Sequence, residues 1–179
     1  MRQPLLPIVL CTLMGSSFSA NAAHRQHGAH VHGVATLSVA LEDHTLNVEF
    51  ESPAVNLVGF EHAPADDRQR QAVAQAAQQL RNPAALFTLA DAAHCVSVST
   101  TVNSALLDAP AANANGEHRH ADFNATYGFR CAQPQALRTL EVRLFALFEG
   151  IQKIDAQWLT AGAQSATVLT PEHFRITLQ

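Results

Sequence analysis

Residues 34–52 alternate between apolar and polar side chains on both sides of a short polar turn. Every second position from Ala35 to Leu41 is apolar, and the alternation resumes from Leu46 to Phe50 after the sequence EDHT. A period of two places alternate side chains on opposite faces of a strand, which predicts a β-hairpin with one buried face. A chain with such a hairpin must cover that face with a second layer.

Two helices are predicted after the hairpin. The first covers 64–81, because Pro64 suits a first helical position and the apolar residues from Val73 to Leu80 recur with a helical period. The dipeptide Asn82-Pro83 then predicts the start of a shorter helix that runs to residue 90.

The remaining chain is rich in strand patterns. Residues 137–148 fit both periods, and we expect a strand that passes into a helical turn near 145–148. Further strands are expected at 94–102, 121–131, 153–161, 164–170 and 174–179. The predicted fold class is α+β, an antiparallel β-sheet with two or three helices packed on one face.

The N-terminus has the pattern of a secretory signal peptide. A basic start at Arg2 precedes about ten apolar residues, and Ala20 and Ala22 stand at the −3 and −1 positions of a cleavage site. We therefore expect a signal peptide at 1–22, a histidine-rich segment at 23–33 and a single domain at 34–179. Within that domain, residues 103–120 lack any period and are expected to form a long loop. No other apolar run is long enough to predict a membrane span in the mature chain.

Export changes the meaning of the cysteines and of the charge. Loss of Cys11 with the signal peptide leaves Cys95 and Cys131, for which a disulfide is the default in an oxidising compartment. The mature chain keeps ten of the eleven basic residues against fifteen acidic ones, a net charge of −5. Without a basic stripe, neither nucleic acid nor an anionic membrane surface is an expected partner.

Histidine is the residue type that points to chemistry. Two His-x-His pairs precede predicted strands, one of them beside a third histidine three residues earlier. Residues i and i+2 of a strand share a face, so two imidazoles at that spacing can reach one ion, and two such pairs at neighbouring strand starts would complete a four-nitrogen shell. The expected ligands are His27, His30, His32, His118 and His120. Zn²⁺ fits this set best, and Cu²⁺ and Ni²⁺ are also able to bind it.

Other interpretations remain open from the sequence. The N-terminal histidines would also suit a solvated tail, and Glu117 or Asp122 could replace an imidazole as a ligand. His62 precedes an acidic helix start, where it could either pack or bind metal. Motifs of the common enzyme classes are not apparent, and a zinc hydrolase would need Glu117 as a base beside an open metal position, so we do not expect an enzyme.

Three segments of the chain resemble the ZrgA-like periplasmic zinc-binding proteins, a family formerly catalogued as a domain of unknown function. They are HGAHVHGVATLSVALEDHTLNVEFESPAVNLVGFEHAP, HADFNATYGFRCAQPQAL and LFALFEGIQKIDAQWLTAGAQSATVLT. SPAVNLVGFEHAP and ATYGFRC are their most specific parts. The resemblance implies a periplasmic protein that binds zinc and assists its uptake beside an ABC-type zinc importer. Members often carry a long His/Asp-rich run in the central loop, where this chain has only GEHRH, so its expected zinc capacity is lower.

Two functions follow as hypotheses. The first is a non-enzymatic zinc buffer or chaperone whose affinity falls below about pH 6, because protonated imidazoles do not bind metal. The alternative is an envelope protein-interaction module with incidental histidines, which would use the long loop and the NLVGF segment as contact surfaces.

Overall fold

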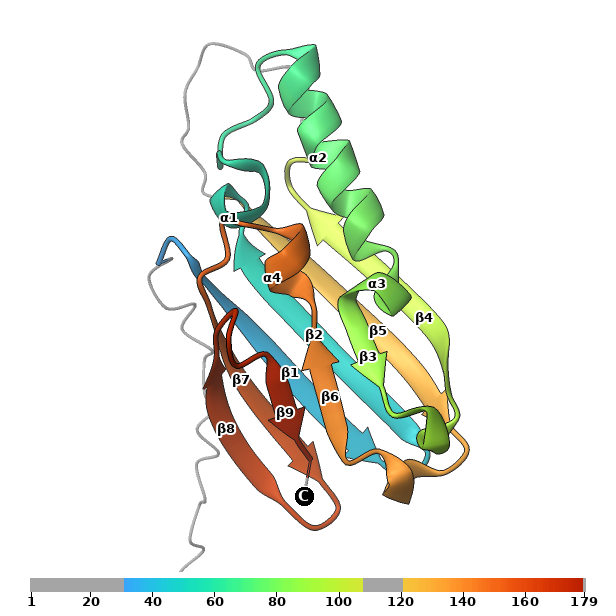
Figure 1. Ribbon diagram of the computed structural model, residues 1–179. Coiled ribbons are helices and arrows are strands. Elements are labelled where there is room, and N and C mark those ends of the chain that lie inside the picture. The colour runs from blue at the N-terminus through green and yellow to red at the C-terminus, as the bar shows by residue number, and fades with distance from the viewer. Residues whose placement is uncertain (1–30, 108–120, 179) are drawn as a thin grey trace, which may run out of the picture.

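The computed structural model describes residues 31–107 and 121–178, which form a six-stranded sheet covered on one face (Figure 1). The strand order across this sheet is β4-β5-β2-β1-β7-β8. These strands are β1 (Val34–Glu42), β2 (Thr45–Pro53), β4 (Cys95–Ser104), β5 (Asp122–Cys131), β7 (Lys153–Thr160) and β8 (Gln164–Leu169).

The covering layer combines helices with a second, smaller sheet. Three short strands pair in the order β3-β6-β9, and they lie on the same side of the large sheet as the helices (Figure 1). The strands are β3 (Phe87–Leu89), β6 (Thr139–Val142) and β9 (Arg175–Thr177), and the helices are α1 (Val55–Val58), α2 (Asp67–Leu80), α3 (Pro83–Leu86) and α4 (Leu144–Leu147). The α+β class and the covered single face are therefore confirmed.

The predicted hairpin forms β1 and β2 with the expected faces. Leu41 pairs with Leu46 beside the turn, and Val39 pairs with Val48 further along the ladder. Except for Leu41, which is partly buried, the alternating apolar positions of both strands lie in the core, where burial of a Leu, Val or Phe side chain stabilises the fold by about 1.5–3 kcal/mol. The alternation of residues 34–52 thus reports correctly which face of the large sheet is covered.

Helix α2 covers part of that face. Its apolar stripe is buried as predicted, at Val73, Ala76, Ala77 and Leu80. The helix begins at Asp67 rather than at residue 64, because the Asp66 side chain accepts a hydrogen bond from the Gln69 N–H and caps the helix there.

The second predicted helix is wrong beyond Leu86. α3 ends there, and residues Phe87–Leu89 form β3, which pairs with β6. Phe87 is buried with its ring in edge-to-face contact with those of Tyr127 and Phe129. Packing of this aromatic group outweighs the local helix signal, since tertiary context commonly overrides propensity.

The large sheet is mixed rather than purely antiparallel. β1 pairs with β7 in parallel, while each of the other neighbouring pairs runs antiparallel. The carbonyl oxygen of Gly33 accepts hydrogen bonds from the backbone N–H groups of Gln152 and Lys153, so both strands enter the sheet from the same end. Periodicity indicates the faces of a strand and carries no information about the direction of its neighbour.

Strand β4 lies at one side of the large sheet and is joined covalently to β5. A disulfide links Cys95 to Cys131, the pair expected from the sequence. The register shifts between Ser97 and Ser99, and Val96 and Val98 are 60% and 61% exposed although the strand alternates. A bulge in an outer strand redirects side chains away from the core, which accounts for these two exposed valines.

Candidate metal centre

The five predicted ligands fall mostly outside the described residues. His32 is described, whereas His27, His30, His118 and His120 are not, and the same holds for the predicted signal peptide at 1–22 and for most of the predicted loop at 103–120.

The strands that follow the two His-x-His pairs begin at the same end of the large sheet. β1 and β5 both run antiparallel to β2, which lies between them. We call this the entry end, the end at which Gly33 and Asp122 stand where β1 and β5 begin and Pro53 stands where β2 ends. The two starts are not direct neighbours, since two strand spacings separate them by roughly 10 Å.

Helix α1 closes the entry end (Figure 1). The N–H of Ala54 donates to the carbonyl of Ala121 at 2.8 Å, which attaches the start of the helix to the start of β5. From the helix, the side chain of Asn56 reaches β1: its Oδ1 accepts from the N–H of Gly33 at 2.7 Å, and its Nδ2 donates to the carbonyl of Val34 at 2.9 Å. α1 therefore contacts both strands that follow a histidine pair.

His32 lies beside a carboxylate at this end. Its Nε2 is 3.8 Å from Oε1 of Glu61, which follows α1 in the chain. The His32 side chain is 70% exposed and the Glu61 side chain 13%, so a solvent-accessible imidazole faces a largely buried carboxylate. Imidazole nitrogen and carboxylate oxygen are both common zinc ligands, and a carboxylate also orients a metal-binding histidine by accepting its second N–H.

His62 makes local contacts next to this pair. Its Nδ1 is 2.9 Å from the carbonyl oxygen of Ala63, and its ring stacks on Phe60 with 5.1 Å between centroids. These contacts support the packing interpretation of His62. The helix that follows is capped by Asp66, so His62 has no part in the start of α2.

The described residues do not by themselves make a metal site. Within residues 31–107 and 121–178, no three His, Cys, Asp or Glu side chains lie close enough together to hold a metal ion. Structural zinc sites use four protein ligands and catalytic sites three, so His32 and Glu61 supply two ligands at most.

The histidines at the opposite end of the sheet, His44 and His94, form hydrogen bonds with backbone groups. We call this the disulfide end, marked by Cys95 and Cys131. His44 Nδ1 lies 2.8 Å from the carbonyl oxygen of Cys131, and the carbonyl of His94 accepts from the N–H of Ala132. His94 also adopts a left-handed backbone conformation, with φ of 46°, at the C-terminus of a short 3-10 helix (Asp91–Ala93). These contacts give both residues a structural role.

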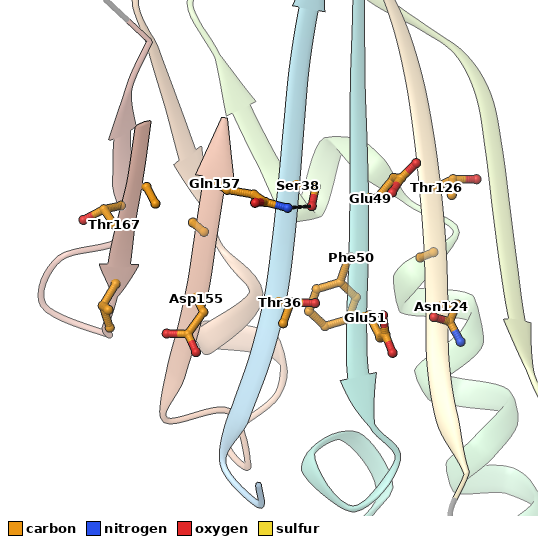
Figure 2. Close-up of a pocket in the computed structure, with 14 residues that line it drawn as sticks. Thr36, Ser38, Glu49, Phe50, Glu51, Asn124, Thr126, Asp155, Gln157 and Thr167 are labelled. Carbon is orange, nitrogen blue, oxygen red and sulfur yellow. Dashed lines mark hydrogen bonds between the residues drawn. The ribbon is translucent and has the colours of Figure 1, made fainter. Parts of the chain in front are cut away.

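The uncovered face of the large sheet carries the other prominent surface feature, an open groove of about 710 Å³. Figure 2 shows polar side chains of β5, β2, β1, β7 and β8 at this groove, with Gln157 Nε2 donating to Ser38 Oγ at 2.9 Å. Its labelled polar residues are Thr36, Ser38, Glu49, Glu51, Asn124, Thr126, Asp155, Gln157 and Thr167.

The acidic residues of this groove, Glu49, Glu51 and Asp155, do not gather into a metal-binding group of three ligands within residues 31–107 and 121–178. Thr36 pairs with Glu51 on one side and with Asp155 on the other, so two strand spacings, roughly 10 Å, separate the backbones of these two acidic residues. Lys153 Nζ also lies 3.0 Å from Oδ1 of Asp155 and offsets its charge. The groove is a polar surface without the geometry of a metal site.

Glu61 and Asn56 are the site residues that histidine spacing did not reveal. Both belong to the segment SPAVNLVGFEHAP, which carries the most specific part of the family resemblance. Neither apolar periodicity nor metal-ligand spacing singles out either residue. The only indication in the sequence was that both lie in SPAVNLVGFEHAP, to which no role had been assigned.

The chain was compared with known proteins. No curated protein sequence matches it. A family model described as ZrgA family zinc uptake protein matches residues 29–178, a range that includes the histidine pair before β1, the whole of α1 and both disulfide cysteines. The chain belongs to the ZrgA family of zinc uptake proteins.

Proposed function

We propose that the protein is an exported, non-enzymatic zinc binder of the periplasm that buffers zinc or carries it to an ABC-type importer. The observation that carries the proposal is the approach of His32 to Glu61 at the end of the sheet where β1 and β5, the strands that follow the two histidine pairs, begin. Family membership supports a role in zinc uptake.

In the proposed site, His32 and Glu61 are joined by His30 and by the histidines that precede β5, His118 and His120. His27 adds a further imidazole, and Asp122 stands at the start of β5 as a second carboxylate. Nitrogen and oxygen ligands suit Zn²⁺, and Cu²⁺ and Ni²⁺ are competitors for such a set.

Exposure of His32 suits a carrier. The His32 ring is largely in solvent, so a second protein can approach the metal without unfolding the sheet. Neutral imidazoles bind zinc and protonated ones do not, so we expect zinc release as the pH falls below about 6.

Isothermal titration with Zn²⁺ tests the proposal on the mature chain, from residue 23 onward. The variant replaces His27, His30, His32, His118 and His120 with Ala. We expect its affinity for zinc to fall by at least about 100-fold relative to the wild type, since it loses every imidazole of the site. His44→Ala is the matched control, because this exposed histidine lies at the disulfide end, opposite the entry end.

Equal zinc affinity in the wild type and the five-histidine variant would end the proposal. Export is checked separately by fractionating cells that express the full chain. Mature protein that begins at Ala23 in the periplasmic fraction supports the predicted cleavage.

The groove on the uncovered face favours a second candidate, an envelope protein-interaction module. The NLVGF segment offers less contact surface than the groove, because Asn56 is buried and Leu57, Val58 and Phe60 are partly buried against the core. The groove would instead meet a partner through its polar side chains. This function predicts that the complex with the partner persists after treatment with a chelator, and that addition of zinc does not change the melting temperature of the protein.

A further inference from the structure

We propose that Asn56 is a positioning residue, which holds the backbone at Gly33, directly after His32, in the conformation that sets His32 beside Glu61. The inference rests on the proposed zinc function and assigns a role to a residue that is not itself a ligand. It concerns the junction between the histidine segment and the folded domain.

The Asn56 side chain is bonded on each of its polar atoms. Its Oδ1 accepts from the Gly33 N–H at 2.7 Å, and its Nδ2 donates both to the Val34 carbonyl and, at 3.0 Å, to the hydroxyl of Ser52. Asn56 is 4% exposed and Ser52 is fully buried. Buried amides satisfied in this way have one available rotamer, so the network defines where the backbone of β1 begins.

Gly33 is held from both sides. While Asn56 accepts from its N–H, its carbonyl oxygen accepts from the N–H groups of Gln152 and Lys153 at 2.8 and 2.9 Å. Its φ of +82° is a conformation that residues with a side chain rarely adopt, and a Cβ at this position would lie 3.0 Å from the Gln152 side chain. The residue directly after His32 therefore has a single backbone conformation.

The same short segment that carries the anchor carries the carboxylate. Asn56 lies within α1, and Glu61 follows its C-terminal Gly59 by two residues. Gly150 packs directly on the backbone of Asn56, where a Cβ would collide with the Asn56 carbonyl oxygen. α1 is thus wedged between β1 and the loop before β7, and the distance from His32 to Glu61 depends on it.

This geometry predicts how replacement of Asn56 affects metal binding. If Asn56 is replaced, His32 and Glu61 both remain in the chain, but their relative position is no longer imposed. Supporting residues behind metal ligands commonly change affinity by about 10–100-fold, and we expect about 10-fold weaker zinc binding for Asn56→Ala.

The test measures Zn²⁺ affinity by titration and the visible spectrum of Co²⁺ in the same proteins. Asn56→Ala is compared with the wild type, with His32→Ala, and with Ile176→Ala or Ile176→Val in β9. The Ile176 variant chosen is the one whose urea midpoint matches that of Asn56→Ala, because Ile176 is buried in the small sheet and has no bond to α1. Ser52→Ala removes only the hydroxyl behind Asn56 and carries the test if Asn56→Ala does not fold.

The expected result is weaker zinc binding and an altered Co²⁺ spectrum for Asn56→Ala, a smaller change of the same kind for Ser52→Ala, and wild-type values for the Ile176 variant. Hydrogen exchange adds a readout without metal, since the Gly33 amide should exchange faster in Asn56→Ala alone. The inference is overturned if His32→Ala weakens zinc binding while both Asn56→Ala and Ser52→Ala leave it unchanged. If His32→Ala leaves zinc binding unchanged as well, the result overturns the role given to His32 in the proposed function.

Discussion

The two ends of the large sheet both carry histidines, yet they hold them in different ways. At the disulfide end, the ring of His44 is bonded to the backbone carbonyl of Cys131, next to a covalent link between strands. At the entry end, the His32 ring is exposed and faces the Glu61 carboxylate. The structural His44 and the candidate ligand His32 thus differ in the partner of the imidazole, which is a backbone carbonyl for His44 and a carboxylate for His32.

The ends also differ in how they are held together. The disulfide end relies on the bond between β4 and β5, which closes a loop with a sequence separation of 36 residues. The entry end relies on the buried amide of Asn56 and on backbone hydrogen bonds around Gly33. Stability and metal binding should therefore be separable by substitutions at one end or the other.

The largest expected effect is loss of the disulfide. Replacement of both Cys95 and Cys131 by Ala should lower the free energy of unfolding by about 3–4 kcal/mol, from the loop-closure entropy that the bond removes from the unfolded chain. Urea denaturation measures this change. Zinc affinity, measured where the variant is still folded, should equal that of the wild type, and a parallel loss of zinc binding would contradict the separation of the two ends.

The core between the two ends gives the next effect. Burial raises the pKa of Tyr127, whose hydroxyl donates to the carbonyl of Leu80 at 2.9 Å. Above about pH 10 the unfolded chain loses this proton and the folded chain keeps it, so stability falls by about 1.4 kcal/mol per pH unit. The difference in stability between about pH 9 and about pH 11 should shrink in Tyr127→Phe.

Tyrosinate absorbance provides a direct check, because Tyr127 is the single tyrosine of the sequence. Absorbance should rise together with the loss of folded structure during an alkaline titration. A rise that precedes unfolding would show that the folded protein ionises this residue. Glu61→Gln should have the same alkaline profile as the wild type, because this substitution leaves the Tyr127 hydroxyl and its hydrogen bond to Leu80 in place.

A smaller effect is expected from the carboxylate at the entry end. Glu61→Gln should weaken zinc binding by about 10-fold, because it removes a charged oxygen ligand or orienting group next to His32. Glu172→Gln serves as the control, since Glu172 is exposed and its hydrogen bond goes to Thr170. Titration calorimetry distinguishes the two variants, and equal affinities would remove Glu61 from the site.

The smallest effect is expected from His44→Ala. It removes the contact between the exposed His44 ring and the Cys131 carbonyl, and should cost about 1 kcal/mol or less in unfolding free energy. Zinc affinity should not change. If His44→Ala weakened zinc binding as much as His32→Ala does, exposure and backbone hydrogen bonding would not distinguish structural histidines from metal ligands.

Much of the fold could be predicted from local patterns. Alternation assigned the faces of β1 and β2, the apolar stripe assigned the buried side of α2, and the passage from β6 into α4 matched the change of period near residue 145. The helix expected through Phe87 failed, because that ring is required in the core against Tyr127. Local periods succeed where they agree with long-range packing and fail where they do not.

The candidate site was only half accessible from the sequence. Histidine spacing and export indicated a metal, and His32 was among the residues named. Glu61 was not, since 29 positions separate the two residues and no ligand spacing connects them. Their approach depends on the path of α1, which the Asn56 network sets.

The sequence by itself determined the class of the protein: an α+β chain with a signal-peptide pattern, a cysteine pair, clustered histidines and the segments of a zinc-related family. Only the tertiary structure decided that β7 lies parallel to β1, that β1 and β5 begin at one end of the sheet with β2 between them, and that Glu61 stands beside His32. The physical reason is range. Side-chain periods and cleavage signals act over a few residues, whereas the order of strands and the meeting of distant side chains follow from how the whole chain buries its apolar surface.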